Sequence, residues 1–170
     1  MRLLFLLILM NIATVSFAQT GWETTVDAEN GRKVYRGQFT FEDLKAEKTF
    51  DWLQKGTEEY KPNIAAIKFL QKRLADYHMV VVMGTWCSDS HDMIPRLYKV
   101  LQLTKYPMSQ YTMYGVNRKK ESLYAESKLY KIVNVPTIIL YKNNMEVGRI
   151  TETVRLSVET DLQDIIEKDK

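Results

Sequence analysis

The chain has 170 residues, of which 45% are hydrophobic and 26% are charged, so its composition suits a single soluble globular domain. The formal net charge is only +3, and the lysine and arginine residues are spread among aspartate and glutamate residues. These charges form no basic patch that would predict nucleic-acid binding and no acidic tail that would predict disorder. We therefore expect no nucleic-acid partner.

Residues 1–18 have the pattern of a secretory signal peptide. Arg2 is followed by an apolar run and then by a segment of small residues, and we expect cleavage after Ala18. The alternative is a transmembrane anchor, which would need about 20 apolar residues, whereas Asn11 interrupts this run. The sequence thus predicts export across the inner membrane into the periplasm, with no stable membrane span after the leader is removed.

Residues 19–78 are expected to form an N-terminal extension that leads into the main fold. It begins with a predicted hairpin over 24–39, because β-forming residues stand on both sides of Asn30 and Gly31. The Asn-Gly pair favours the positive dihedral angles of a tight two-residue turn.

Two helical segments are predicted in the rest of this extension. A partly helical apolar pattern over 41–55 indicates an element that covers the core and stops at Gly56. A clearer helix follows, and one face of it is apolar. That face carries Ile64, Ile67, Leu70 and Leu74.

Residues 79–170 are expected to form the core of the fold, in one globular domain with the extension. The run at 79–83 is continuously apolar and rich in β-branched residues, which suits a strand buried on both faces. The predicted order is strand, helix, strand, helix, hairpin, helix. Further strands are expected at 111–116, 133–141 and 147–151, and helices after Cys87, around 123–130 and after a capping Ser157.

The only cysteine, Cys87, follows the apolar run at 79–83 directly. The polar residues after it are typical of the first turn of a helix, where unpaired backbone N–H groups favour a thiolate. A single cysteine allows no internal disulfide, and such a thiol in an exported protein is either buried and inert or reactive. The polar neighbours favour the reactive interpretation over a buried structural thiol.

Residues next to Cys87 each allow more than one interpretation. Ser90 either caps the helix or hydrogen-bonds the Cys87 sulfur. His91 is either a solvated first-turn residue or the base of a Cys-His pair. Two ligands do not make a zinc site, so we expect no metal and no other cofactor. Trp86 is expected at the rim of the site rather than in the core, and Asp89 would oppose a thiolate by like charge.

Arg118 and the preceding Asn117 follow a predicted strand whose end should open on the same side as Cys87. A solvated loop is one interpretation of these two residues, and contact with a substrate is the other.

Two separated motifs resemble the thioredoxin superfamily. The first is Trp86-Cys87 after a buried strand, with Pro95 eight residues beyond the cysteine, and the second is the segment VPTIILYKNN. The resemblance implies a thioredoxin-like α/β fold: a central mixed sheet flanked by helices on both faces, preceded by the hairpin and helices of the extension. It also implies that Cys87 is the nucleophile, and that a cis bond between Val135 and Pro136 lies beside it. An extended substrate could then pair with the backbone there.

More narrowly, the chain resembles thioredoxin-like proteins exported by Bacteroidetes-type bacteria, here with a monothiol Cys-Ser-Asp-Ser motif. Three positions depart from the thioredoxin pattern. Ser90 stands where the resolving cysteine would be, so a mixed disulfide at Cys87 cannot be released by internal attack. Val81 replaces the buried aspartate that serves proton transfer. Glu152 stands where thioredoxins have a glycine near the active site, and it would contact a substrate or destabilise the thiolate.

The leading hypothesis is monothiol thiol-disulfide exchange or covalent capture by Cys87, in an oxidoreductase or isomerase that acts on a protein or a small thiol or disulfide. The alternative is a non-catalytic binding module that uses the cis-proline groove. A disulfide-linked homodimer through Cys87 is a third alternative. The Cys87→Ala variant separates the first two hypotheses, because only the first loses its function.

Overall fold

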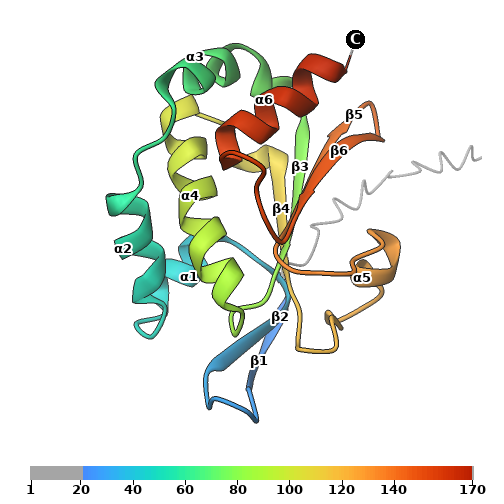
Figure 1. The fold of residues 1–170 in the computed structure, drawn as a ribbon. Coiled ribbons are helices and arrows are strands. Elements are labelled where there is room, and N and C mark those ends of the chain that lie inside the picture. The colour runs from blue at the N-terminus through green and yellow to red at the C-terminus, as the bar shows by residue number, and fades with distance from the viewer. Residues whose placement is uncertain (1–20, 170) are drawn as a thin grey trace, which may run out of the picture.

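The computed structural model describes residues 21–169, and the predicted signal peptide at 1–18 lies outside them. Within the described residues, six strands form one mixed sheet in the order β1-β2-β4-β3-β5-β6 (Figure 1). The central pair, β3 and β4, is parallel, and all other neighbouring pairs are antiparallel. The strands are β1 (Trp22–Val26), β2 (Lys33–Phe39), β3 (His78–Met83), β4 (Tyr111–Gly115), β5 (Thr137–Lys142) and β6 (Met145–Thr151).

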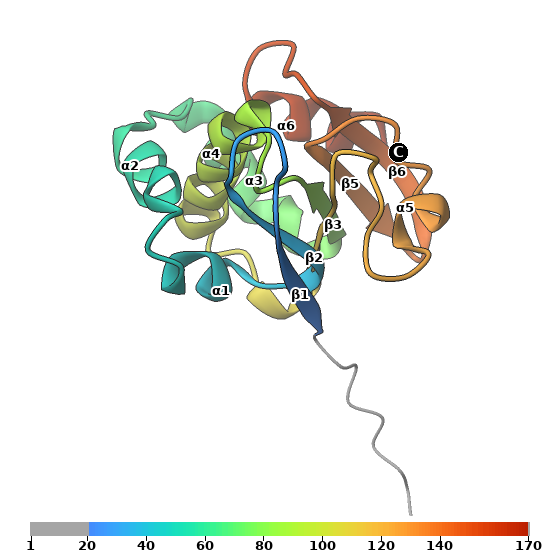
Figure 2. The same cartoon turned by 90° about the horizontal axis from the view of Figure 1, so that it is seen from below.

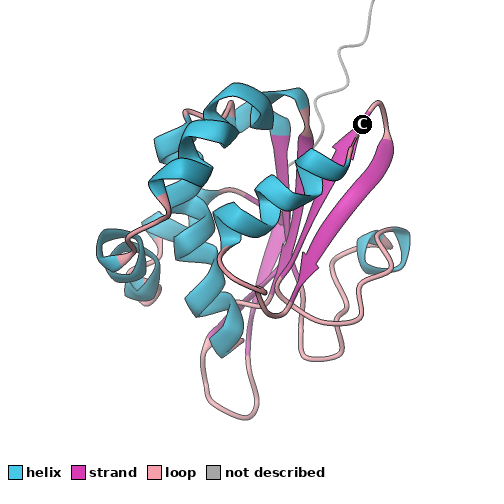
Figure 3. Ribbon diagram, turned by 45° about the horizontal axis from the view of Figure 1, so that its top comes forward, coloured by secondary structure: helices cyan, strands magenta, loops and turns pink. Residues whose placement is uncertain are grey.

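Helices cover the two faces of this sheet unequally. Five of the described helices lie on one side of the strands, whereas the short α5 lies on the other side (Figures 1 and 3). The helices are α1 (Phe41–Ala46), α2 (Asp51–Glu59), α3 (Ile64–Arg73), α4 (Ser88–Thr104), α5 (Glu126–Leu129) and α6 (Val158–Lys168), with short 3-10 turns at Leu74–Asp76 and Met108–Gln110.

The buried strand predicted at 79–83 is confirmed as the centre of the sheet. Every residue of β3 after His78 is buried, and its side chains alternate between two clusters. Val81 packs in the large cluster beneath the five helices, whereas Val80 and Val82 pack in a small cluster on the α5 side. The position that carries a buried aspartate in thioredoxins is therefore wholly apolar here.

The predicted N-terminal hairpin exists, but its turn differs from the expectation. The strands β1 and β2 pair from Trp22–Gly37 to Val26–Lys33, which leaves a six-residue loop at 27–32 in place of a two-residue turn. The Asp27 backbone closes this loop, since its N–H donates to the Arg32 carbonyl over 2.8 Å. Its side chain accepts from the Glu29 N–H over 2.8 Å, which draws the chain out of the ladder.

Gly56 lies inside α2 and does not end it. A Cβ atom there would lie 2.8 Å from Cβ of Pro95 on α4, so the glycine lets the two helices approach closely. The predicted helix around 123–130 is reduced to the four residues of α5. Ile64, expected on the apolar face of α3, is 60% exposed. By contrast, the Ser157 hydroxyl caps α6 as predicted, accepting from the Thr160 N–H over 3.3 Å.

Candidate functional site

Cys87 lies at the N-terminus of α4, at the end of the loop that follows β3. Its backbone N–H donates to the Gly84 carbonyl over 3.0 Å, and its carbonyl accepts from the His91 N–H over 3.1 Å, as the first bond of the helix. The residue is 8% exposed, and its thiol donates to the carbonyl oxygen of Val135 over 3.5 Å. The sulfur is therefore held between the first turn of α4 and the segment that enters β5.

The segment that enters β5 is fixed by hydrogen bonds on both sides of a cis Val135–Pro136 peptide bond. The Pro136 carbonyl accepts from the Glu152 N–H over 2.7 Å, and the Thr137 hydroxyl donates to the Asn134 carbonyl over 2.7 Å. Val135 is 3% exposed and packs in the same small apolar cluster as the cysteine. The backbone that faces the thiol is therefore rigidly placed.

Ser90 makes neither of the two contacts considered from the sequence. Its hydroxyl is fully buried and accepts a hydrogen bond from the Gly84 N–H over 3.2 Å. No side chain caps the N-terminus of α4, whose capping residue is Cys87 itself. The hydroxyl turns back toward the loop after β3 because the Gly84 N–H, buried at that point, needs an acceptor.

His91 is a packed residue and not a solvated one. Its ring stacks on Trp52 of α2, with 4.4 Å between ring centroids and 13° between planes. Its Nε2 lies 2.7 Å from the Thr85 carbonyl oxygen, which can only accept, so Nε2 carries the proton. Burial lowers the pKa of His91; the Thr85 hydrogen bond works against this shift, and the charge of Arg32 adds to it. Because Nε2 is occupied, it does not serve the cysteine as a base.

Trp86 and Arg118 form one side of the site together. The Trp86 ring lies against Gly84, where a Cβ atom would come within 2.7 Å of the indole, and its Nε1 donates to the Val116 carbonyl over 2.7 Å. The Arg118 guanidinium lies 4.8 Å from the centre of that ring. Trp86 is only partly buried, in agreement with a rim position.

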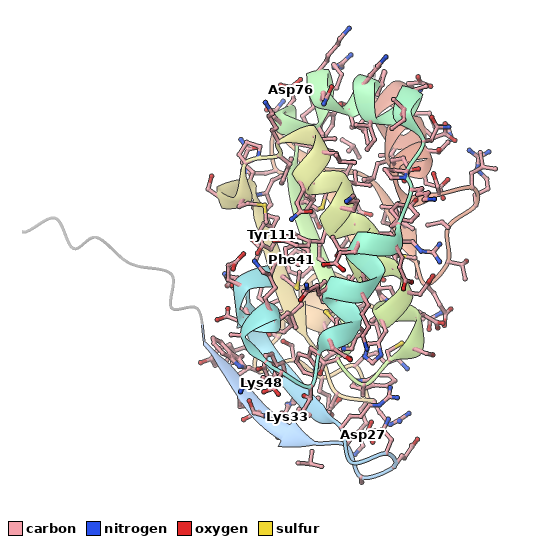
Figure 4. The ribbon with its side chains drawn as sticks, turned by 90° about the vertical axis from the view of Figure 1, so that its left-hand side faces the viewer. Asp27, Lys33, Phe41, Lys48, Asp76 and Tyr111 are labelled. Atoms are coloured by element: carbon pink, nitrogen blue, oxygen red, sulfur yellow. The ribbon has the colours of Figure 1, made fainter. Side chains whose placement is uncertain are left out.

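Arg118 is engaged by acidic groups of the hairpin loop and is not simply solvated. Its Nε donates to both carboxylate oxygens of Asp27, over 3.1 and 2.8 Å, and its Nη1 lies 2.9 Å from Glu29. The Asp27 side chain is 2% exposed although it lies at the end of the hairpin (Figure 4). The preceding Asn117 accepts from the N–H groups of Lys119 and Glu121, each over 2.9 Å, and so shapes its own loop.

Glu152 and Asp89 come from two other segments, the residues directly after β6 and the first turn of α4. Glu152 has a backbone φ of 62°, the left-handed region that favours glycine, and its carboxylate accepts from the Asn134 side-chain amide over 2.8 Å. Thioredoxins have a glycine at this position, and the backbone of Glu152 has the left-handed conformation that glycine adopts easily. Asp89 is exposed in the first turn of α4.

Several of these residues surround one open cavity of about 480 Å³, with Cys87 in its wall. Figure 2 shows the hairpin loop near the start of α4, and both segments contribute residues to the cavity wall. Among the residues predicted for the site, the cavity does not include Ser90, His91 and Pro136. It is lined by Asn30, Arg32, Trp86, Cys87, Ser88, Asp89, Arg118, Lys120, Asn134, Val135 and Glu152.

Sequence reasoning missed Asp27, Arg32, Lys120 and Asn134. The first two were hidden by the expectation of a tight two-residue turn, which would have left no loop long enough to reach the cysteine. No motif connects residues 27–32 to the loop after β4, and the acid–base pair that joins them is too common in sequences to be informative. Asn134 was the easiest of the four to predict, because it directly precedes the motif that contains Val135 and Pro136.

Among residues 21–169, no three histidine, cysteine, aspartate or glutamate side chains are grouped so that they could hold a metal ion. In the same part of the chain, no helix combines the length and apolarity needed to cross a bilayer.

No protein-family model and no curated protein matches the sequence. Among solved structures, a protein of unknown function from Pseudomonas aeruginosa is 14% identical with a TM-score of 0.52, and covers 78% of this chain and 84% of its own. An HIV epitope scaffold is also 14% identical with a TM-score of 0.52, over 77% and 84%. Oxidised thioredoxin O2 from Arabidopsis thaliana is 17% identical over 61% and 83%, with a TM-score of 0.39.

The first two likenesses concern the fold alone. The parallel β3-α4-β4 unit, the antiparallel β5-β6 hairpin that follows Pro136, and the closing α6 reproduce the topology that the two sequence motifs implied. The chain therefore has a thioredoxin-like α/β fold, with a single cysteine at the N-terminus of the helix after its central strand.

Proposed function

We propose that this is an exported thioredoxin-like protein that acts through the Cys87 thiol in monothiol thiol-disulfide exchange. The observation that carries the proposal is the position of the thiol, in the wall of an open cavity, at a helix N-terminus and 3.5 Å from the Val135 carbonyl. A thiolate is the nucleophile in such an exchange, and the Cys87 sulfur lies at the helix terminus where backbone N–H groups have no intrahelical partner. The Val135 backbone offers an extended partner a place to pair beside the sulfur.

The exchange balances without a second cysteine in the chain. The Cys87 thiolate attacks one sulfur of a partner disulfide, a mixed disulfide forms, and the other partner sulfur leaves as a thiolate. An external thiol then attacks the mixed disulfide, regenerates the Cys87 thiolate and leaves with the partner's sulfur in a new disulfide. The substrate is a protein or small-molecule disulfide, and the external thiol supplies the electrons.

The decisive experiment measures the reaction of Cys87 with a neutral mixed-disulfide probe, using protein purified after expression of the whole chain. We expect the native protein to react at least tenfold faster than cysteine in a short unstructured peptide at pH 7, because the cavity presents the sulfur at the helix N-terminus and beside the Val135 backbone. A rate equal to or below that of the peptide would refute a nucleophilic role. The Cys87→Ala variant is the blank for both measurements.

The Ser90→Cys variant tests the half of the cycle that this chain lacks. A thiolate at position 90 would attack Cys87 Sγ in the adduct, form an internal disulfide and release the partner as a thiolate. We expect adducts of the native protein to persist until a thiol is added, and adducts of the variant to decay without one. The Ser90→Ala variant is the matched control, because it also removes the hydroxyl that accepts from Gly84.

Export to the periplasm is part of the proposal and rests on the leader pattern at 1–18. Cell fractionation combined with N-terminal sequencing of the purified protein tests it. We expect the protein in the periplasmic fraction, beginning after Ala18; a cytoplasmic protein that keeps Met1 or Arg2 would contradict it.

A second candidate function is favoured by the burial of the thiol. Cys87 is only 8% exposed and packs with Val80, Val82 and Ile139, as a structural cysteine would in a non-catalytic module that binds partners along Val135. Comparing Cys87→Ala and Cys87→Ser in a partner-capture assay separates the two functions. Capture that survives both substitutions supports the binding module, and capture that is lost in both supports the thiol.

A further inference from the structure

We propose that the two loops beside Cys87 recognise a carboxylate carried by the substrate next to its reacting sulfur, through Arg32 and Lys120. This inference rests on the proposed thiol chemistry and adds the substrate class to it. The loops are the hairpin loop at 27–32 and the loop at 117–121 after β4. Both contribute residues to the wall of the cavity that contains Cys87.

Arg32 and Lys120 are the cations of the cavity that no acidic group engages within residues 21–169. Neither forms an ion pair with any side chain in this part of the chain. Arg118, the third cation of the cavity wall, is held by both Asp27 and Glu29. The first two charges are thus free to meet an anion, whereas the third has a structural partner.

The loops that carry the two cations are held in place before any substrate binds. The buried Asp27 carboxylate joins the hairpin loop to Arg118 in the other loop. A second connection runs from Arg36 of β2, whose guanidinium donates to the Ser122 carbonyl over 2.9 Å and to the Glu121 carbonyl over 3.2 Å. Because these contacts fix both backbones, less conformational entropy is lost when the cations engage a ligand.

The charges in the cavity wall are separated by sign. Asp89 and Glu152 line the cavity as well, and the same two residues also line a neighbouring cavity of about 230 Å³ that Arg32 and Lys120 do not reach. The two acidic residues of the wall therefore lie toward α4 and β6, and its cations lie toward the two loops, where Arg118 pairs with the acidic Asp27 and Glu29. An anionic substrate group is favoured at the loop end and opposed at the other end, which fixes the direction of the bound substrate.

The chemistry that fits is a disulfide with a carboxylate a few atoms from one of its sulfurs. The carboxylate is either part of a small acidic disulfide or an acidic side chain beside a disulfide-bonded cysteine in a protein. In both cases the Cys87 thiolate attacks the nearer sulfur, a mixed disulfide forms, and the remaining sulfur leaves as a thiolate. Guanidinium and ammonium groups in the cavity wall lower the free energy of the anionic encounter complex.

The test compares three small disulfides of different charge on the purified protein: anionic dithiobis-nitrobenzoate, neutral dithiodipyridine and cationic cystamine. The variant Arg32→Gln/Lys120→Asn removes both charges; asparagine is chosen because Lys120 has a φ of 60°, which asparagine tolerates. The control variant Lys68→Gln/Lys72→Gln removes two exposed charges from α3, at the other end of the sheet (Figure 1).

We expect the anionic probe to react about tenfold more slowly with the site variant at low salt, and the neutral probe to change by less than about twofold. The control variant should match the native protein with all three probes. The native rate with the anionic probe should also fall with added salt, more steeply than that of the site variant. Arg32→Gln alone should give a part of the same effect, and it serves if the double variant folds poorly.

Two results would overturn the inference while leaving the thiol chemistry intact. An equal loss with the neutral probe means that the substitutions alter access to the sulfur, and no loss with the anionic probe means that the cations do not contribute. If no probe reacts with the native protein, the proposed function itself fails. Two peptides identify the source of the carboxylate: each has a thiopyridine-activated cysteine, which lies between glutamates in one and between serines in the other. If the native protein prefers the glutamate peptide by more than about fivefold and the site variant loses this preference, the substrate is a protein. If there is no such preference but the effect with the small anionic probe remains, the substrate is a small acidic disulfide.

Discussion

The two faces of the central sheet are packed in very different ways, although the same strands supply both. On the face under the five helices, Met79, Val81 and Ile138 belong to a large cluster with residues from α1, α2, α3, α4 and α6. On the other face, Val82 and Ile139 belong to a small cluster that is covered only by side chains of the α5 region and the nearby loops. Cys87 belongs to the small cluster.

This difference means that one face of the sheet mainly stabilises the fold, whereas the other face holds the Cys87 sulfur. The large cluster removes most of the apolar surface from water and so supplies most of the driving force for folding. The small cluster has a thin cover, which leaves the sulfur in the wall of an open cavity. Substitutions that are equal in size should therefore have different consequences on the two faces.

Ile138→Ala and Ile139→Ala give the largest expected effects and compare the faces directly. The two residues are neighbours on β5, both are fully buried, and their side chains enter the large and the small cluster respectively. We expect Ile138→Ala to lower the free energy of unfolding by about 4 kcal/mol and Ile139→Ala by about 2 kcal/mol, because the thinly covered face can collapse around the missing atoms. Urea unfolding measures both values.

The same pair should differ in the opposite sense at the thiol. We expect Ile139→Ala to change the rate at which a neutral disulfide probe reacts with Cys87, and Ile138→Ala to leave it within about twofold under native conditions. Equal losses of stability together with equal probe rates would show that the two faces are not functionally distinct.

The Asp27→Asn variant should give the next largest effect, and it tests whether the hairpin loop beside the cavity contributes to the stability of the fold. The carboxylate is buried and pairs with Arg118, so we expect a loss of about 1–3 kcal/mol in the free energy of unfolding. Glu29→Gln is the matched control, since Glu29 pairs with the same guanidinium but is 66% exposed, and it should cost less than about 0.5 kcal/mol. A control variant as unstable as Asp27→Asn would contradict the role given to the buried carboxylate.

The sequence predicted the well-packed face far better than the cavity. The buried strand β3, the helix after Cys87, and the β5-β6 hairpin follow from apolar periodicity and turn residues, which are local signals. Gly56 was misjudged as a stop because its function is close approach to Pro95, a contact between segments 39 positions apart. Contacts of that kind leave no periodic trace in the sequence.

The cavity was predicted mainly where a motif marks it, and Arg118 was the exception, since the strand before it indicated its place. Trp86, Cys87 and Val135 were found because two short motifs resemble a known family, and all three line the cavity. Ser90 and His91 were given roles at the sulfur on sequence distance alone, yet their polar atoms contact the Gly84 N–H and the Thr85 carbonyl. The two side chains form hydrogen bonds with backbone groups of the loop after β3, and sequence spacing does not reveal which backbone groups need a partner.

A smaller effect on stability is expected from substitutions of Glu152, whose backbone conformation favours glycine. The carboxylate bonds to Asn134 at the acidic end of the cavity, but the left-handed backbone conformation disfavours a side chain. We expect Glu152→Gly to be more stable than Glu152→Ala by about 1 kcal/mol, because both lose the hydrogen bond but only glycine relieves the backbone. Urea unfolding of the two variants and the native protein measures this difference. Equal stability would show that the conformation is not strained.

The smallest expected effect is a pH dependence of stability that comes from His91. Burial lowers its pKa in the folded protein, whereas in the unfolded chain the imidazole has its ordinary pKa of about 6.5. Below that pH the unfolded state binds the proton more readily than the folded state. The stabilising contribution is therefore fully present above pH of about 6.5 and is lost as the pH falls toward the lowered pKa.

We expect the free energy of unfolding to decrease between about pH 7.5 and 5.5, and to decrease less in His91→Gln, which keeps a donor for the Thr85 carbonyl but does not titrate. His78→Gln is the necessary companion, because burial lowers the pKa of His78 too and gives the same sign. Lowered carboxyl pKa values, such as that of Glu47 at about 2, act below this window. If both single variants keep the native slope, the pH dependence does not come from these histidines, and the packing of His91 on Trp52 tolerates its charged form.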